Sequence, residues 1–186
     1  MRTPNRYLLL FFFVTVFISL ALGKQVFASE HPKKFTVITT VAPITNMVRN
    51  IGGVYIDVIG VVPDGVDSHT FEPIPSDIKT LQAADLIIAN GLDLELPTLK
   101  LAEKVKKPAT RVVQLGNRTL KEEDWQYDFS FPREHGHPNP HLWLNIQLVM
   151  QYAEIIRDSL SELDPKHQEQ YFLNTETYLA KLTKLD

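Results

Sequence analysis

The sequence contains no cysteine among its 186 residues. This absence excludes disulfide bonds, thiolate metal ligands, a cysteine nucleophile and a lipidated N-terminal cysteine. A metal site in this chain must therefore use histidine, carboxylate or carbonyl groups. An excess of positive charge is also lacking, because 22 acidic residues outnumber 19 basic ones. An acidic chain repels phosphate backbones, so we expect no nucleic-acid partner. Cations, and partners with a basic docking surface, are compatible with this charge.

A long uncharged run lies near the N-terminus. Residues 7–23 carry no charge, two arginines precede them and a lysine follows. This pattern predicts a secretory signal peptide over residues 1–28, cleaved after Ala28. An uncleaved membrane anchor is the alternative, but a spanning helix needs about 20 apolar residues, which this run does not reach. We therefore expect a soluble periplasmic protein without a lipid anchor.

From residue 35 onward, segments typical of strands alternate with segments typical of helices. The predicted strands cover residues 35–41, 54–62, 86–89 and 111–115, and the helices between them cover residues 43–51, 75–84 and 98–107. This order predicts an α/β fold, in which a four-stranded parallel sheet is flanked by helices. Ligands of such sheets gather beyond the carboxyl ends of the strands.

The pattern changes after the fourth predicted strand. Residues 116–141 show no periodicity and predict one long loop, a length that is typical of functional or mobile loops. Apolar residues at helical spacing return at residue 146, and an Asp-Pro pair then ends that helix and starts another. We expect an α/β domain over residues 29–145 and a helical segment over residues 146–186.

Four of the six histidines lie in segments suited to metal binding. His69 follows the second predicted strand, and His141 stands between two prolines and a Leu-Trp-Leu run. Two imidazoles on rigid loops at one end of a sheet can bind one cation: zinc, copper, iron or nickel, or manganese where carboxylates complete the shell. His135 and His137 flank a glycine, and they predict either a weak accessory site that captures metal or no role.

Three motifs resemble one family, the zinc, manganese and iron solute-binding proteins of bacterial ABC importers. Residues 61–73 (Val-Val-Pro-Asp-Gly-Val-Asp-Ser-His-Thr-Phe-Glu-Pro) resemble its first ligand loop. Residues 90–95 resemble its Asn-Gly-Leu-x-Leu-Glu segment, and residues 139–145 resemble its second ligand motif. The resemblance extends over residues 35–186, and it implies two α/β lobes that are joined by one long helix and hold the metal between them.

The resemblance also assigns roles to residues. His69 and His141 match the two metal ligands of the N-terminal lobe, and the segment from residue 164 resembles the start of the linking helix. Two further ligands would belong to a C-terminal lobe that residues 1–186 do not contain. Zinc is the first expectation for the metal. Manganese and iron stay open, because residues 133–137 are much shorter than the histidine-rich loop of some zinc-specific members.

These observations predict a transport protein rather than an enzyme. We expect a monomer that captures a divalent transition metal in the periplasm and delivers it to the membrane permease of an ABC importer. A zinc-dependent hydrolase is one alternative, but the sequence has no His-Glu-x-x-His motif and no obvious general base. A metal-dependent adhesin or interaction module, which would use the acidic surface, is another alternative.

Overall fold

The computed structural model describes residues 33–185, so the predicted signal peptide lies outside the described residues. The strands in this range are β1 (Phe35–Thr39), β2 (Ile56–Gly60), β3 (Leu86–Ala89) and β4 (Arg111–Gln114). They form a parallel sheet in the order β2-β1-β3-β4. The prediction of a four-stranded parallel sheet is confirmed.

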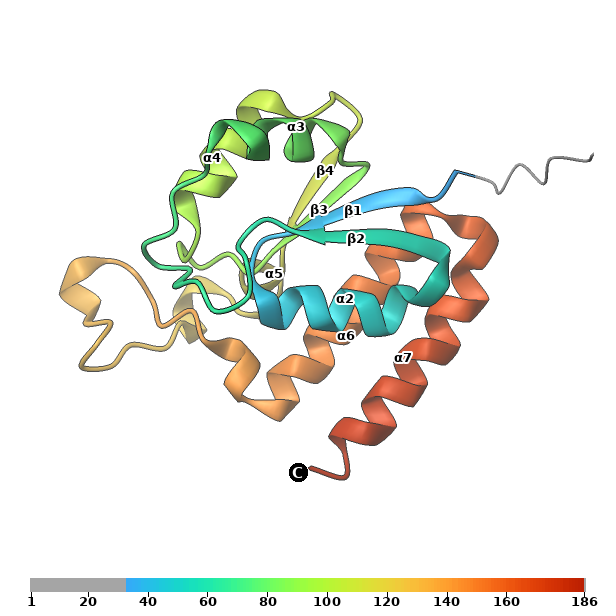
Figure 1. Cartoon of the computed structure of the whole chain (residues 1–186). Helices are drawn as coiled ribbons and strands as arrows, with labels where there is room; N and C mark the ends of the chain where they lie inside the picture. The colour runs from blue at the N-terminus through green and yellow to red at the C-terminus, as the bar shows by residue number, and fades with distance from the viewer. Residues whose placement is uncertain (1–32, 186) are drawn as a thin grey trace, which may run out of the picture. The chain divides into compact units, whose positions relative to one another are not determined.

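Helices cover both faces of this sheet (Figure 1). They are α2 (Ala42–Gly52), α3 (Pro75–Ala83), α4 (Leu96–Val105), α5 (Leu115–Thr119), α6 (Ile146–Leu163) and α7 (Gln168–Leu182). Helices α3 and α4 lie on one face, and α2, α6 and α7 lie on the other. All four residues of β3 are buried as a result, which explains its unbroken apolar sequence. Within residues 33–185, no helix is both long and apolar enough to cross a membrane.

The prediction that residues 116–141 form one loop is wrong at its start. The chain leaves β4 and enters the short helix α5 at once, with Leu115 and Gly116 buried. Five residues are too few to show a helical repeat, so the sequence pattern could not reveal this helix. The rest of the segment is irregular apart from two single 3₁₀ turns, Glu122–Asp124 and Arg133–His135.

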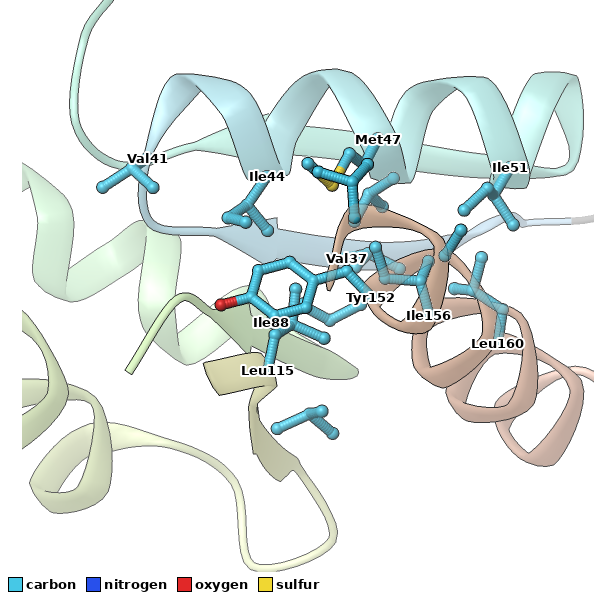
Figure 2. Packing of buried hydrophobic residues seen from close by; sticks show 14 of the residues in the cluster. Val37, Val41, Ile44, Met47, Ile51, Ile88, Leu115, Tyr152, Ile156 and Leu160 are labelled. Atoms are coloured by element: carbon cyan, nitrogen blue, oxygen red, sulfur yellow. The ribbon is translucent and has the colours of Figure 1, made fainter. Parts of the chain in front are cut away.

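The larger hydrophobic core lies between the sheet and helices α2, α6 and α7. Figure 2 shows Ile44 and Ile51 of α2 facing Tyr152, Ile156 and Leu160 of α6, and all five side chains are fully buried. Helix α7 joins the same core through two buried residues. Helix α6 therefore packs into the same core as the sheet. The predicted boundary between the α/β domain and the helical segment, at residue 145, lies directly before this helix.

Candidate metal-binding site

The segments that carry the two predicted ligands meet at the carboxyl edge of the sheet (Figure 1). His69 lies in the loop that follows β2, and His141 lies just before the single 3₁₀ turn that leads into α6. The two residues are 72 positions apart in the sequence, yet their Nε2 atoms are separated by 3.1 Å. The fold thus brings these two imidazoles together, at the edge where parallel sheets bind their ligands.

The distance between the two nitrogens suits a shared ion. With zinc–nitrogen bonds of about 2.0–2.1 Å, two ligating nitrogens stand about 3.3 Å apart at a tetrahedral angle and about 2.9 Å apart at a right angle. The observed 3.1 Å lies between these values. The imidazole pair therefore accommodates tetrahedral or octahedral coordination with a small adjustment, and its spacing does not select one metal.

Asn139 orients the imidazole of His141. Its Oδ1 accepts hydrogen bonds from Nδ1–H and from the backbone N–H of His141, at 2.8 and 3.0 Å. The first bond places the ring proton on Nδ1 and leaves the Nε2 lone pair directed at His69. The side-chain amide of Asn139 in turn donates to Oδ2 of Asp128 at 2.5 Å. Neither Asn139 nor Asp128 was expected as a site residue, because their roles depend on contacts that spacing does not reveal.

Aromatic rings pack against the pair of imidazoles. The Phe131 ring lies 5.8 Å from the ring of His69 and 5.4 Å from that of His141, measured between centroids. Trp143 meets His141 edge-on at 5.1 Å. On the other ligand loop, the backbone N–H of His69 donates to Oδ1 of Asp67 at 2.9 Å. The Phe131 ring thus contacts both imidazoles, and a hydrogen bond to Asp67 shapes the backbone that carries His69.

Burial lowers the pKa of His141 below its ordinary value of 6.5, the neighbouring His69 lowers it further, and Asp128 opposes the shift. We expect an NMR titration of the metal-free protein to give a midpoint below 6.5 for this ring. Neutral imidazole is the form that binds metal. Between its lowered pKa and pH 6.5, the His141 ring is therefore still neutral and able to bind a metal ion. In that window the unfolded chain takes up a proton that the folded chain does not, so the free energy of unfolding falls as the pH decreases. A midpoint at or above 6.5 would contradict this expectation.

A buried polar network fixes the chain beside the second ligand. Asn90, which follows β3, donates from Nδ2 to the backbone carbonyl of Pro140 at 3.0 Å. Oε1 of Glu95 accepts from Thr40 Oγ1 at 2.6 Å and from the backbone N–H of Asn90 at 2.7 Å. The hydroxyl of Tyr152 donates to Oδ1 of Asn90 at 3.2 Å. These bonds connect β1, β3 and α6 to the segment that presents the second ligand, a role that the sequence motif did not indicate.

Glu95 lies at the centre of this network, with only 2% of its surface exposed. Burial raises the pKa of its carboxyl group, and hydrogen bonds from Thr40, Asn90 and Gly91 oppose that shift. Removing the carboxyl group would leave these buried donors without an acceptor, which costs more than the bonds themselves contribute.

Near the site, Gly91 with φ of 82° and Gly136 with φ of 77° adopt the left-handed conformation. A Cβ on Gly91 would lie 2.2 Å from Oδ1 of Asn117 and 2.9 Å from Cβ of Gln114, whereas a Cβ on Gly136 meets no described atom within 4 Å. We expect Gly136→Ala to lower the free energy of unfolding by about 1 kcal/mol, from backbone strain alone. Gly91→Ala should lower it by about 1–3 kcal/mol more, because overpacking adds to the strain. Equal losses in urea denaturation would contradict this account.

The other two predicted histidines lie apart from this arrangement. Nδ1 of His137 is 3.0 Å from Oδ2 of Asp93, in a solvent-exposed pair, rather than beside His69 or His141. His135 ends the 3₁₀ turn Arg133–His135. Within residues 33–185, no group of three or more histidine, cysteine or acidic side chains is placed to hold a metal ion. The accessory capture site stays a prediction.

Residues 37–186 match the family described as ZnuA, Zinc-uptake complex component A periplasmic. The chain belongs to this family. It is 35% identical over 193 residues to the manganese ABC transporter substrate-binding lipoprotein PsaA of Streptococcus mitis, covering 100% of this chain and 60% of the relative. It is also 35% identical over 158 residues to the iron-binding protein YfeA of Yersinia pestis, covering 85% of this chain and 49% of the relative.

A solved structure supports the same membership. The Mn-bound periplasmic metal binding protein of candidatus liberibacter asiaticus superimposes with a TM-score of 0.69 and 30% identity, over 80% of this chain and 53% of that chain. The chain thus spans between about half and 60% of the length of these similar proteins. The printed descriptions of these similar proteins name different metals, manganese and iron, so the comparisons do not select one ion.

Proposed function

We propose that this chain captures a divalent transition metal as the substrate-binding component of an ABC importer and delivers it to the membrane permease. His69 and His141 are the proposed ligands. The observation that carries the proposal is the 3.1 Å separation of their Nε2 atoms. Family membership supports it, since the descriptions of the family and of two relatives name zinc, manganese and iron.

The proposed site needs further ligands. Two imidazoles supply half of a four-coordinate shell, and the residues from 33 to 185 offer no group of three metal-binding side chains. We propose that the missing ligands come from a second lobe of the intact protein. In this proposal residues 29–145 form the N-terminal metal-binding lobe, and residues 146–186 lead into the helix that joins the lobes.

Zinc is the first proposed ion, because imidazole nitrogen is a favoured zinc ligand, while manganese or iron would bind if carboxylates complete the shell. The test is a direct titration of the purified protein with Zn²⁺, Mn²⁺ and Fe²⁺, with Mg²⁺ as the control. We expect saturable binding of one zinc ion per chain and no binding of Mg²⁺, which prefers oxygen ligands. Absence of saturable binding by all three transition metals would overturn the proposal.

We also propose that the chain catalyses no reaction and works as a monomer. A peptidase or esterase activity that requires added zinc and disappears in His141→Ala would overturn the first point. Sedimentation of a stable dimer would overturn the second. Both measurements use the same protein as the metal titration.

The proposed location is the outer side of the cytoplasmic membrane, where the family's proteins are described as periplasmic. We propose that the mature protein carries no lipid anchor, because the 186 residues contain no cysteine. The description of PsaA as a lipoprotein points the other way. Mass spectrometry of the mature protein decides between the two, since an attached lipid adds a discrete mass.

A further inference from the structure

The loop of residues 126–139 closes on itself beside the candidate site. At its base, the backbone N–H of Asn139 donates to the carbonyl of Gln126 at 2.8 Å. Close to that base, Oδ1 of Asp128 accepts from the backbone N–H groups of Ser130 and Phe131, at 2.8 and 3.0 Å. Asp128 therefore shapes the turn that places the Phe131 ring against both imidazoles.

The second carboxylate oxygen of Asp128 has a different partner. Oδ2 accepts from the side-chain amide of Asn139 at 2.5 Å, and Oδ1 of that amide accepts from Nδ1–H of His141 at 2.8 Å. The chain of contacts thus runs from a carboxylate, through an amide, to the imidazole. Partial desolvation raises the pKa of Asp128, but the hydrogen bonds from Phe131, Asn139 and Ser130 lower it below 3.8 overall, so the carboxylate is charged at neutral pH.

The two ends of an asparagine side-chain amide have opposite hydrogen-bonding roles. Its oxygen accepts hydrogen bonds and its nitrogen donates them, and a half-turn about the terminal bond exchanges the two. A carboxylate beside the nitrogen stabilises one of the two orientations, because it accepts and cannot donate, and the backbone N–H of His141, which donates to Oδ1 at 3.0 Å, favours the same orientation. If the Asn139 amide turned over, its NH₂ group would face Nδ1 of His141 and would favour the tautomer that carries its proton on Nε2. That proton would occupy the position that a metal ion needs.

We propose that Asp128 is a positioning residue for metal binding: it fixes the orientation of the Asn139 amide and thereby keeps the His141 proton on Nδ1, away from the ion. This inference rests on the proposed function. Partners of this kind, which do not touch the metal, change metal affinity by about 10–100-fold when they are removed.

The first test is Asp128→Asn in the full chain. Asparagine has one oxygen, so it can serve the backbone N–H groups of Ser130 and Phe131 or the amide of Asn139, but not both. We expect zinc affinity to fall by about 10–100-fold in a competition titration. The matched control is Glu134→Gln, which removes one negative charge from an exposed position on the same loop. The control should bind zinc as the wild-type protein does, which separates positioning from general attraction of a cation.

The second test exchanges the carboxylate and the amide between positions 128 and 139. In the double variant Asp128→Asn/Asn139→Asp, the amide at position 128 donates to the new carboxylate, whose other oxygen accepts from Nδ1–H of His141. The net charge is that of the wild-type protein. We expect zinc affinity to return at least to the wild-type value, because the hydrogen bonds between positions 128, 139 and 141 are formed again with donor and acceptor exchanged between residues 128 and 139.

The third test is the tautomer itself, observed through the ¹⁵N shifts of the His141 ring in the metal-free protein. We expect the proton on Nδ1 in the wild-type protein and in the double variant, and a shift toward Nε2–H in Asp128→Asn. Unchanged zinc affinity or an unchanged tautomer in Asp128→Asn would overturn the proposal. A wild-type chain that fails to bind transition metals would instead refute the proposed function, and the tautomer measurement would still decide the role of Asp128.

Discussion

His141→Ala is expected to weaken zinc binding by more than about 100-fold, beyond the range found for residues that act only through a ligand. The substitution removes one of the two Nε2 atoms that lie 3.1 Å apart. A single imidazole cannot chelate, so the ion regains water in place of the lost nitrogen. His69→Ala should have the same effect, because each ring contributes one nitrogen. Competition titration against a chelating dye measures both variants.

The matched control for this prediction is His135→Ala. This residue also carries an imidazole, but it lies at the end of an exposed 3₁₀ turn. We expect at most a small loss of zinc affinity in this variant. Wild-type affinity in both His69→Ala and His141→Ala, or an equal loss in all three variants, would show that the imidazole pair is not the binding site.

Leu160→Ala should strongly lower the free energy of unfolding. Leu160 lies on α6, is fully buried, and points into the core shared with α2 (Figure 2). Removing a buried leucine side chain costs about 2–5 kcal/mol, because the lost burial is combined with a cavity that the surroundings fill only partly. Urea denaturation monitored by circular dichroism measures the change in the free energy of unfolding.

Leu173→Ala is the matched control, since it makes the same chemical change on the neighbouring helix α7. Leu173 is 48% exposed, so we expect a loss of about 0.5 kcal/mol or less. Similar losses in the two variants would mean that α6 does not share the core of the sheet. Such a result would also contradict the placement of His141, because that residue lies just before α6 and its position depends on how α6 packs on the sheet.

Local patterns explain why much of the fold was predictable. The uninterrupted apolar run of β3 lies in the middle of the sheet, where both faces are covered. The side chain of Asn145 accepts from the backbone N–H groups of Gln147 and Leu148, a contact within one turn that starts α6 where the apolar pattern begins. The helix predicted over residues 98–107 starts at Leu96 instead, with a proline in its first turn. Errors of this size arise because periodicity marks the interior of a helix better than its ends.

The candidate site was predictable in its ligand types but not in its supporting residues. The absence of cysteine restricts metal binding to imidazole, carboxylate and carbonyl groups, and the motifs selected His69 and His141. Asp128, Asn139 and Glu95 contribute through hydrogen bonds whose partners lie far along the chain or in irregular segments. Such contacts have no period, so no spacing rule reveals them.

The amino-acid sequence sets the alternation of strands and helices, because that alternation follows from local apolar periodicity. It also determines which side chains are available as ligands. The tertiary structure brings two imidazoles 72 residues apart to within 3.1 Å, and it connects a carboxylate to one of them through the amide of Asn139. The reason is physical: a ligand site is set by distances of a few tenths of an ångström, and these depend on how the loops at the carboxyl edge of the sheet pack on one another.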